Sequence, residues 1–259
     1  RHISAPIKIN GINRWLYRKA AQHIVTTGET LRQTIMRDLQ IPKEHITSIP
    51  TGIDLQRYSR ENLPNQRVQR ADLGIADDAT VLGIVATLRS WKGHDDLLHA
   101  LKAVIKTQAN TQLLIVGDGP RREHIEALVR ELNLQNHVHL VGQRDDVEQW
   151  LALMDIFILP SYANEGVPQS LMQAMAMALP VISTRVGAID ELVADQQSGL
   201  LVEAQNPQAL QQAIIQLIND NDFCDQAGQY GQHIVQNKYT LPMMVAAMEQ
   251  VFYRVLRDR

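Results

Sequence analysis

The sequence predicts an α/β fold, a doubly wound parallel sheet with helices on both faces, and two observations support that prediction. From residue 80 onward, apolar runs of strand length alternate with segments of helical period. The runs are almost continuously hydrophobic, which a parallel sheet requires when helices cover both of its faces. The alternation and the buried character of the runs together indicate a Rossmann-like domain.

The expected elements follow one another in a regular order. Strands are expected at 80–88, 111–117, 137–142, 155–160, 180–185 and 199–203. Helices are expected near 93–107, 121–133 and 145–153, after Pro168, and near 188–194, 206–219, 222–236 and 241–257. Each strand is thus followed by a helix, as crossover connections between parallel strands need.

The residues before 80 have a different organisation. The stretch "WLYRKAAQHIVTTGETLRQTIMRDL" predicts helix, strand and helix, and "HITSIPTGID" predicts one more strand. Two or three strands without the rest of their sheet make a poor independent domain. The expected division of the chain is a remnant of an N-terminal α/β domain at 1–52, a linker broken by Pro64 at 53–79, a main domain at 80–240, and a helix that crosses back to the N-terminal domain at 241–259.

Composition excludes some classes of protein. The net charge of -3 and the pI near 6.3 argue against a protein devoted to nucleic acid, which needs a dominant basic surface. A single cysteine, Cys224, cannot form an internal disulfide, and no apolar run or signal peptide indicates membrane insertion or export. A cytoplasmic location is therefore expected. The chain starts at Arg1 rather than at a Met, so we expect it to be a piece of a longer protein.

The start of the chain is locally basic. It alternates aromatic and basic side chains in "RWLYRK", and Glu29 is the one acid among residues 1–37. This pattern favours an anionic membrane surface as a partner, with a solvated helix face that covers a neighbouring domain as the alternative. The basic residues are Arg1, Lys8, Arg14, Arg18, Lys19, Arg32 and Arg37.

Ligands of open parallel sheets bind beyond the carboxyl ends of the strands, so the loops there are the first place to look for a site. In "LRSWKG", Arg89 and Lys92 follow the first main strand and Gly93 allows close backbone approach. Two such cations can hold a diphosphate, Arg as a fork and Lys as a point charge. The alternative is a pair of surface cations near a helix start.

The loop "GDGP" after the second main strand contains Gly117 and Gly119, which permit a tight turn into a helix that starts around Pro120. It is not a dinucleotide-binding fingerprint, because the third glycine and the following acid are missing as a set. A structural turn is the simpler interpretation.

The stretch "NEGVPQSLMQ" is the most informative one. Gly166 lets the chain turn close to a ligand, and Pro168 can open a helix whose free amides face the same rim. Glu165 and Gln173 would be about 12 Å apart if the intervening residues were helical, which matches the hexose-to-ribose separation of a sugar nucleotide. Both side chains can accept hydrogen bonds from vicinal hydroxyls. The alternatives are an N-cap role for Glu165 and solvent exposure for Gln173.

Other segments have simpler interpretations. Gly187 and Glu191 in "TRVGAIDELV" are expected to be ordinary turn and surface residues. No histidine has partners at metal-site spacing, and neither a nucleophile elbow nor a phosphate-binding P-loop is present. Asp220 and Asp222 predict a helix cap. The methionines of the helix after Pro168 predict core packing.

In this order, the segments resemble the donor-binding half of the retaining family 4 glycosyltransferases of the GT-B architecture. The resemblance covers residues 80 to about 236. Upstream, "HIVTTGETLRQTI" and "IPTGID" resemble the end of that family's acceptor-side domain. The matching segments are "LRSWKG", "LLIVGDGP", "VHLVGQRDDV", "DIFILPSYANEGVPQSLMQAMAMALPVIST", "VGAIDELV" and "SGLLV".

The resemblance implies roles for individual residues. Arg89 and Lys92 would hold the donor diphosphate, and Glu165 would contact the sugar hydroxyls, as a donor-positioning residue rather than a general base. These three are the candidate catalytic residues. The candidate substrate-binding residues are Gly117, at the turn after the second main strand, Gln143 and Arg144, whose loop would receive the base, Gly166 and Val167, whose amides would face phosphate or sugar, and Gln173, which would touch the ribose.

Two positions depart from the family pattern. The family usually has Glu at position 173, so the ribose contact would come from a neutral amide, without the strength of a charge-assisted hydrogen bond. The family's Gly-Arg pair falls on Ala86 and Thr87, which leaves Arg89 to supply the cation. Both departures bear on donor affinity.

The implied reaction is transfer of a hexosyl group from a nucleoside diphosphate sugar to a hydroxyl with retained configuration. No cofactor and no metal are expected, because basic side chains and helix amides stabilise the leaving diphosphate. The expected partners are the donor and a glycan or lipid-linked acceptor, and the expected setting is cell-surface polysaccharide or lipopolysaccharide synthesis at the inner face of the membrane. The alternatives are a donor-binding subunit completed by a separate polypeptide and a sugar-nucleotide epimerase.

Overall fold

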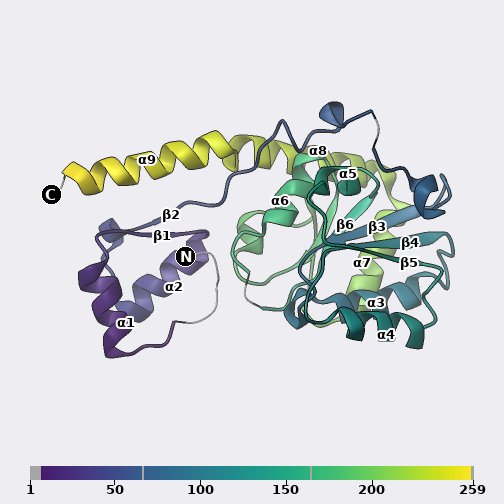
Figure 1. The fold of residues 1–259 in the computed structure, drawn as a ribbon, viewed down its shortest axis with the longest axis horizontal. Helices are drawn as coiled ribbons and strands as arrows, with labels where there is room; N and C mark the ends of the chain where they lie inside the picture. Colours follow the sequence, from purple (N-terminus) through teal and green to yellow (C-terminus); the bar gives the residue numbers. More distant parts are fainter. Residues whose placement is uncertain (1–6, 66, 164, 258–259) are drawn as a thin grey trace.

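The structure is a computed structural model that describes residues 7–65, 67–163 and 165–257. Arg1, expected to belong to the basic start of the chain, lies outside these residues. Two hydrophobic cores divide the described chain: a small one within residues 7–46 and a large one that begins at Ile53. Figure 1 shows the two corresponding units side by side, joined by the linker and by the C-terminal helix.

The larger unit contains a six-stranded sheet whose neighbouring strands are all parallel. Its spatial order is β5-β4-β3-β6-β7-β8. The expected doubly wound α/β fold is therefore confirmed. The strands are β3 (Thr80–Val85), β4 (Thr111–Val116), β5 (Val138–Gly142), β6 (Ile156–Leu159), β7 (Val181–Thr184) and β8 (Gly199–Val202).

Helices cover both faces of this sheet. The helices α3 and α7 contact each other on one face, and α6 and α8 contact each other on the other (Figure 1). Met172, Met175 and Met177 are buried in the core as expected, because α6 packs against β6, β7 and α8. The helices are α3 (His94–Val104), α4 (Arg122–Glu131), α5 (Val147–Leu151), α6 (Gln169–Ala176), the 3-10 turn η6 (Ile189–Glu191), α7 (Pro207–Asn219), α8 (Asn221–Lys238) and α9 (Leu241–Arg257).

The observed strands and helices are shorter than their sequence patterns at the ends that adjoin the loops at the carboxyl edge of the sheet. The run 80–88 is strand only to Val85, and helix α4 starts at Arg122 rather than at Pro120. The apolar residue Leu88 is nevertheless buried, and its amide donates to the carbonyl of Asp118 at 3.0 Å. Apolar character therefore continues past the strand, because the loop itself packs into the core.

The smaller unit is a fragment of sheet with helices. Strands β1 and β2 pair in parallel over three residues each, and α2 packs on them through Leu31, Ile35 and Leu39. Its elements are α1 (Gly11–Trp15), the π-helix η1 (Leu16–Ala20), β1 (Ile24–Thr26), α2 (Glu29–Leu39), the 3-10 turn η2 (Lys43–His45) and β2 (Ile46–Ser48). The linker contains the 3-10 turns η3 (Arg60–Asn62) and η4 (Arg70–Leu73).

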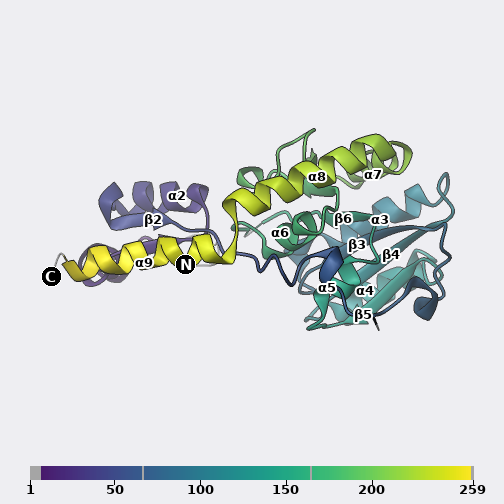
Figure 2. The ribbon, with the colours of Figure 1, turned by 90° about the horizontal axis from the view of Figure 1, so that it is seen from above.

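The C-terminal helix α9 lies alongside the smaller unit in both ribbon views (Figures 1 and 2). Where the chain leaves that unit and where it returns, Ile53 donates to the carbonyl of Tyr239 at 2.8 Å and accepts from the amide of Leu241 at 3.0 Å. Gly52 permits this crossing, because a Cβ there would lie 2.5 Å from the Cα of Leu241. Within the part of the chain that the structure describes, no helix is long and apolar enough to span a bilayer.

Candidate functional site

The candidate site lies where the order of the strands reverses. From β3 the chain proceeds outward to β4 and β5, and from β6 it proceeds in the opposite direction to β7 and β8, so the loops after β3 and β6 diverge and leave a crevice between them. At their base these loops pack tightly. The amide of Tyr162 donates to the carbonyl of Trp91 at 2.8 Å, and a Cβ on Gly93 would lie 2.1 Å from the carbonyl oxygen of Pro160.

This crevice holds a cavity of about 410 Å³, here named the β3–β6 cavity. Both loops and the smaller unit contribute to its wall. The first turn of α6 borders it through Gln169 and Ser170. The other lining residues are Thr27 and Thr51 from the smaller unit, Val85, Ala86, Thr87, Arg89, Trp91 and Lys92 after β3, and Glu165, Gly166, Val167 and Pro168 after β6.

A second cavity of about 280 Å³, here named the β4–β5 cavity, adjoins the first. The two share Val85, Ala86 and Thr87 in their walls, so together they form one elongated depression along the carboxyl ends of β5, β4, β3 and β6. The remaining lining residues of the second cavity are Val116, Gly117, Asp118, Gln143, Arg144 and Val147. Eight of the nine candidate residues named from sequence line one cavity or the other.

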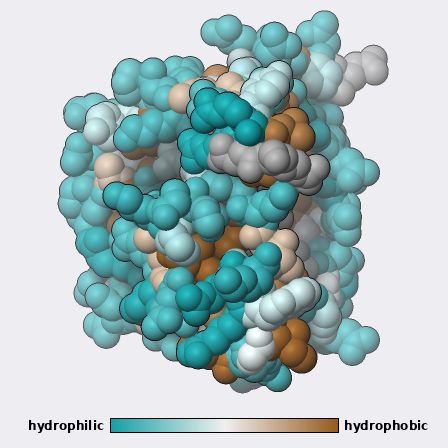
Figure 3. All heavy atoms as spheres, turned by 90° about the vertical axis from the view of Figure 1, so that its left-hand side faces the viewer, coloured by the Kyte–Doolittle hydropathy of each residue, from teal (hydrophilic) through white to brown (hydrophobic). Residues whose placement is uncertain are grey.

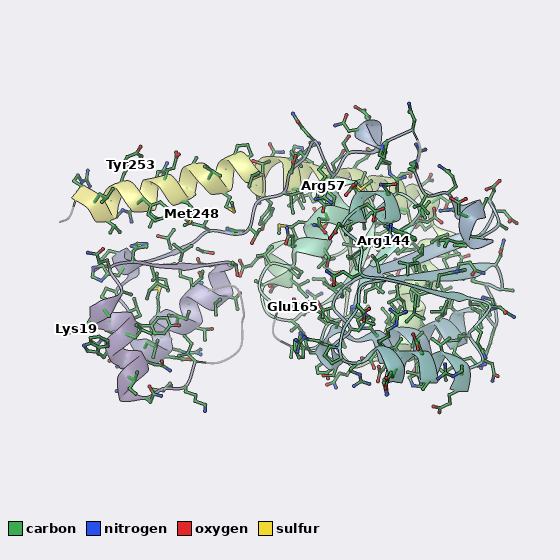
Figure 4. The ribbon with its side chains drawn as sticks, viewed as in Figure 1. Lys19, Arg57, Arg144, Glu165, Met248 and Tyr253 are labelled. Carbon is green, nitrogen blue, oxygen red and sulfur yellow. The ribbon has the colours of Figure 1, made fainter. Side chains whose placement is uncertain are left out.

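The centre of the β3–β6 cavity is an ion pair. Lys92 Nζ lies 2.6 Å from Glu165 Oε1, and the Glu165 side chain is only 6% exposed. Glu165 is therefore held by a cation from the neighbouring loop rather than acting as the cap of α6, whose N-cap position is Pro168. Figure 4 shows Glu165 at the edge of the larger unit that faces the smaller one. The pair places a carboxylate and an ammonium group at one point of the wall.

Arg89 is on the exposed side of the same loop. It occupies the N-cap position of the 3-10 turn η5 (Ser90–Lys92), and its guanidinium lies over the ring of Trp91, with 5.2 Å between Cζ and the ring centroid. Stacking of this kind orients an arginine while leaving its N–H groups available to an anion. Arg89 and Lys92 thus provide two cations on one wall of the cavity.

The first turn of α6 completes this wall. Gly166, Val167 and Pro168 are buried, and α6 begins at Gln169 with no side-chain cap and no acid in its first turn. First-turn amides without a capping side chain have hydrogen-bonding capacity for an anion, and the helix dipole favours negative charge there. The expected helix start after Pro168 is confirmed.

The β4–β5 cavity depends on a close approach of two loops. Gly117 has φ +141, and a Cβ at that position would lie 2.0 Å from the carbonyl oxygen of Ala86. The opposite wall is polar and exposed: Arg144 pairs with Asp146 at 2.9 Å and lies over the Trp150 ring at 5.0 Å. Stacking on Trp150 thus orients Arg144, which is one of the lining residues of this cavity.

Gln173 is the candidate residue that the structure does not bring into the cavities. Among the described residues, the linings of these two cavities do not include it. Its Nε2 instead donates to the hydroxyl of Tyr58 at 2.7 Å. Tyr58 is a buried residue of the linker, and burial raises the pKa of its hydroxyl. Sequence reasoning gave no role to Tyr58, because a contact 115 residues away leaves no local pattern.

The interpretation of Glu191 as an ordinary surface residue was wrong, whereas Gly187 lies in a turn as expected. A Cβ on Gly187, which has φ +66, would lie 2.0 Å from the carbonyl oxygen of Glu165, so this loop packs against the backbone of the cavity. Glu191 reaches the smaller unit, where its carboxylate accepts the amides of Glu29 and Thr30 at 2.7 Å each. No local sequence pattern could reveal this role of Glu191, because Glu29 and Thr30 are more than 160 residues away in sequence.

The remaining polar features are structural. Across the described chain, no group of three or more His, Cys, Asp or Glu is arranged to hold a metal ion. Asp220 caps α8 by accepting from the amide of Phe223 at 2.9 Å, as expected. Behind the cavity, burial lowers the pKa of His94 from its ordinary value of 6.5 to about 4, so this ring stays neutral at physiological pH.

The chain matches the sequence model of the family described as glycosyl transferases group 1 over residues 65–234. Among curated proteins it is similar to the N-acetyl-alpha-D-glucosaminyl L-malate synthase of Bacillus anthracis, with 28% identity over 85% of this chain and 57% of the relative. It is also similar to the capsular polysaccharide biosynthesis glycosyltransferase CapM of Staphylococcus aureus, with 25% identity over 92% of this chain and 63% of the relative. The chain therefore spans about three fifths of the length of these relatives.

Solved structures share the fold. A glycosyltransferase from Rickettsia africae superposes with a TM-score of 0.89 and 21% identity, over 98% of this chain and 69% of that chain. Anabaena HepE in complex with UDP-glucose superposes with a TM-score of 0.85 and 21% identity, over 94% of this chain and 66% of that chain. WaaG, a glycosyltransferase involved in lipopolysaccharide biosynthesis, superposes with a TM-score of 0.76 and 24% identity, over 86% of this chain and 61% of that chain.

Proposed function

The chain belongs to the group 1 glycosyl transferases, and we propose that it binds a nucleoside diphosphate sugar and takes part in transfer of its hexosyl group to a hydroxyl acceptor. The observation that supports this most is the pair of adjoining cavities at the strand-order reversal. The β3–β6 cavity has two cations, a helix start and a carboxylate in its wall, and the β4–β5 cavity is smaller and lies next to a stacked arginine. A nucleoside diphosphate sugar matches this arrangement, because its base can occupy one cavity, its sugar the other, and its anionic diphosphate can lie beside the cations.

The proposed donor lies along the depression. The base enters the β4–β5 cavity between Gly117 and the loop of Gln143 and Arg144. The diphosphate lies beside Arg89 and Lys92, near the amides of the first turn of α6. The sugar occupies the β3–β6 cavity, where Glu165 accepts hydrogen bonds from its hydroxyls. Lys92 then has two anionic partners, since it keeps Glu165 oriented and also faces the phosphates.

The proposed chemistry is electrostatic. As the bond between the anomeric carbon and the β-phosphate oxygen breaks, negative charge develops on the diphosphate, and Arg89, Lys92 and the helix amides stabilise that charge without a metal ion or cofactor. Glu165 has a positioning role, since its carboxylate is already paired at 2.6 Å with Lys92. We propose that the acceptor hydroxyl attacks from the face on which the diphosphate leaves, so that the anomeric configuration is retained.

The smaller unit is the proposed acceptor side. Thr27 and Thr51 extend from it into the wall of the β3–β6 cavity, next to where the sugar is proposed to lie. The sheet in the described part of that unit has two strands, β1 and β2. A second candidate function, favoured by the small size of this sheet, is a donor-binding subunit whose acceptor wall is completed by another polypeptide.

A membrane-facing role is proposed for the start of the chain. Helices α1 and η1 have no buried residue, and Ile12 and Trp15 are 76% and 62% exposed beside Arg14, Arg18 and Lys19. Figure 3 views this end of the molecule and shows apolar side chains at the surface among hydrophilic ones. Exposed aromatic and aliphatic groups next to cations suit an anionic lipid surface, where an acceptor of surface polysaccharide or lipopolysaccharide synthesis would be found.

A thermal-shift panel of UDP, GDP and ADP sugars tests donor binding. A ligand that binds only the folded protein raises its melting temperature by mass action, so one nucleotide class is expected to do so in the unchanged chain. Arg89→Ala and Lys92→Ala should reduce the response, because a weaker ligand raises the melting temperature less at the same concentration, whereas the exposed controls Arg130→Ala and Lys106→Ala should keep it. An undiminished response in both cavity variants contradicts the proposed site.

Two further measurements separate the finer proposals. Hydrolysis of the bound donor by the purified chain supports an enzyme, whereas binding without turnover until a partner is added supports the donor-binding subunit. For the membrane role, vesicles with anionic lipid are expected to retain the chain and to lose it when Trp15→Ala and Lys19→Ala are combined. Equal retention on neutral vesicles contradicts the charge-based part of this proposal.

A further inference from the structure

One side chain that bridges the two units, that of Glu191, has contacts that are unusual for an acid near the surface. Glu191 belongs to η6 of the larger unit, and its carboxylate reaches the first turn of α2 in the smaller one. Oε2 accepts the amide of Glu29 at 2.7 Å, and Oε1 accepts both the amide and the hydroxyl of Thr30 at 2.7 Å. These amides are among the four that a helix cannot satisfy internally.

Helix α2 has no N-cap side chain of its own. Its N-cap residue is Gly28, and the carboxylate of Glu29 is turned toward Arg32 at 2.7 Å. A larger residue does not fit at position 28, because a Cβ would lie 2.8 Å from the Cβ of Ala188. The close approach of the two units thus excludes a local cap, and Glu191 supplies the cap from the other side. The negative charge also suits the positive end of the α2 dipole.

The larger unit holds Glu191 firmly. Ala188 and Ile189 are buried beneath it, and the hydroxyl of Tyr239 donates to the Glu191 carbonyl at 2.8 Å. The same loop contacts the candidate site through Gly187, whose Cα packs on the carbonyl of Glu165. A further cavity of about 120 Å³ between the units is lined by Glu165 and Gly187 on one side and by Thr30, Leu31 and Thr34 of α2 on the other.

From this geometry we propose that Glu191 is a positioning residue that fixes the smaller unit against the donor cavity by capping α2 across the interface. The cap exists only when the two units are together, so breaking it lets the units separate and exposes the amides of Glu29 and Thr30. The wall of the β3–β6 cavity formed by Thr27 and Thr51 then moves away from Glu165. The consequence for catalysis rests on the proposed function, whereas the cap itself does not.

Amide hydrogen exchange of the whole chain tests the cap directly. In Glu191→Ala, exchange at Glu29 and Thr30 is expected to become at least about fivefold faster, the size of effect that loss of a helix cap supports. Glu191→Gln, which keeps one acceptor oxygen, should give a smaller increase. The matched control is Asp190→Ala, an exposed acid on the same turn, which should leave exchange unchanged. Unchanged exchange in Glu191→Ala overturns the proposal.

A distance measurement shows whether the cap holds the units together. Spin labels at Arg37→Cys and Arg130→Cys, in a Cys224→Ser background, report the separation of the two units. Glu191→Ala should broaden the distance distribution toward longer values. Glu191→Gln, which keeps one acceptor oxygen, should give a distribution between those of the unchanged chain and Glu191→Ala. The melting-temperature shift caused by UDP should be the same in all three. A narrow, unchanged distribution contradicts the positioning role. Absence of any UDP response in the unchanged chain counts against UDP binding alone, so the two failures are distinguishable.

Discussion

Lys92 Nζ and Glu165 Oε1 are 2.6 Å apart across the crevice between β3 and β6, and both side chains are largely shielded from water. Each of the two loops that diverge from the sheet thus contributes one charge to this ion pair. The pair holds together the two walls that are proposed to enclose the donor. Its removal should therefore affect stability and binding in different ways.

Lys92→Met is expected to lower the free energy of unfolding by about 3 kcal/mol, because it leaves the Glu165 carboxylate buried without its cation. The double variant Lys92→Met with Glu165→Gln should recover much of that loss, since no unpaired charge remains. Urea unfolding of the single and double variants measures the coupling. If the stability losses of the two single variants add up in the double variant, Lys92 and Glu165 do not interact directly. Lys106→Met, at an exposed lysine, is the control.

Arg89→Ala should leave stability within about 0.5 kcal/mol, because the side chain is exposed, and should weaken donor binding about tenfold through loss of charge-assisted hydrogen bonds. Titration calorimetry with the nucleotide that stabilises the unchanged chain measures the affinity. The same experiment on Arg130→Ala checks that any loss is local. An unaltered donor affinity in Arg89→Ala would show that the Arg89 guanidinium does not bind the donor.

Gln173→Glu should show whether position 173 contacts the ribose. In the structure its amide donates to Tyr58, so a carboxylate there would instead accept from the Tyr58 hydroxyl and from a ribose diol. Donor affinity is expected to rise severalfold. The gain should vanish with a 2′,3′-dideoxy nucleotide, which lacks the diol. A gain of equal size with that nucleotide would mean that the substitution acts through Tyr58 rather than through the ribose.

His94 should make the chain less stable in mild acid. Burial lowers its folded-state pKa from 6.5 to about 4, so the unfolded chain takes up a proton that the folded chain refuses between these values. Stability from this residue is present above pH 6.5 and is lost as the pH falls toward 4, by about 3 kcal/mol in total.

Unfolding free energies at several pH values check this sign. His94→Leu, which removes the titrating group at a similar volume, should flatten the slope between pH 6.5 and 4. His99→Gln, at an exposed histidine of the same helix, should leave the slope as it is. Identical slopes in the unchanged chain and His94→Leu would show that His94 titrates normally in the folded state.

The sequence predicted correctly those features that a local pattern of neighbouring residues determines. Continuous apolar runs predicted six parallel strands, since a strand covered on both faces must be apolar on both. The loops after β3, β4, β5 and β6 were predicted to gather at one rim, since the carboxyl ends of parallel strands meet at one edge, and their residues do line two adjoining cavities there. The polar and glycine residues at those ends, Arg89 and Gly117 among them, therefore line adjoining cavities.

What the sequence could not predict are contacts between distant segments. Glu191 looks like a surface acid in its own loop, and its partners at Glu29 and Thr30 become visible only when the two units meet. Gln173 and Tyr58 are a similar case, because burial of a linker tyrosine decides where the amide points. Strand ends were overestimated at residues such as Leu88, because apolar loop residues that pack into the core look like strand.

The central claim is that a nucleoside diphosphate sugar lies along the two adjoining cavities, and a crystal structure of the chain with the nucleotide sugar that stabilises it tests this most directly. The expected density places the base beside Gly117 and Arg144, the diphosphate beside Arg89 and Lys92, and the sugar within hydrogen-bonding distance of Glu165. Density for the same compound anywhere else, with both cavities empty, would contradict the account.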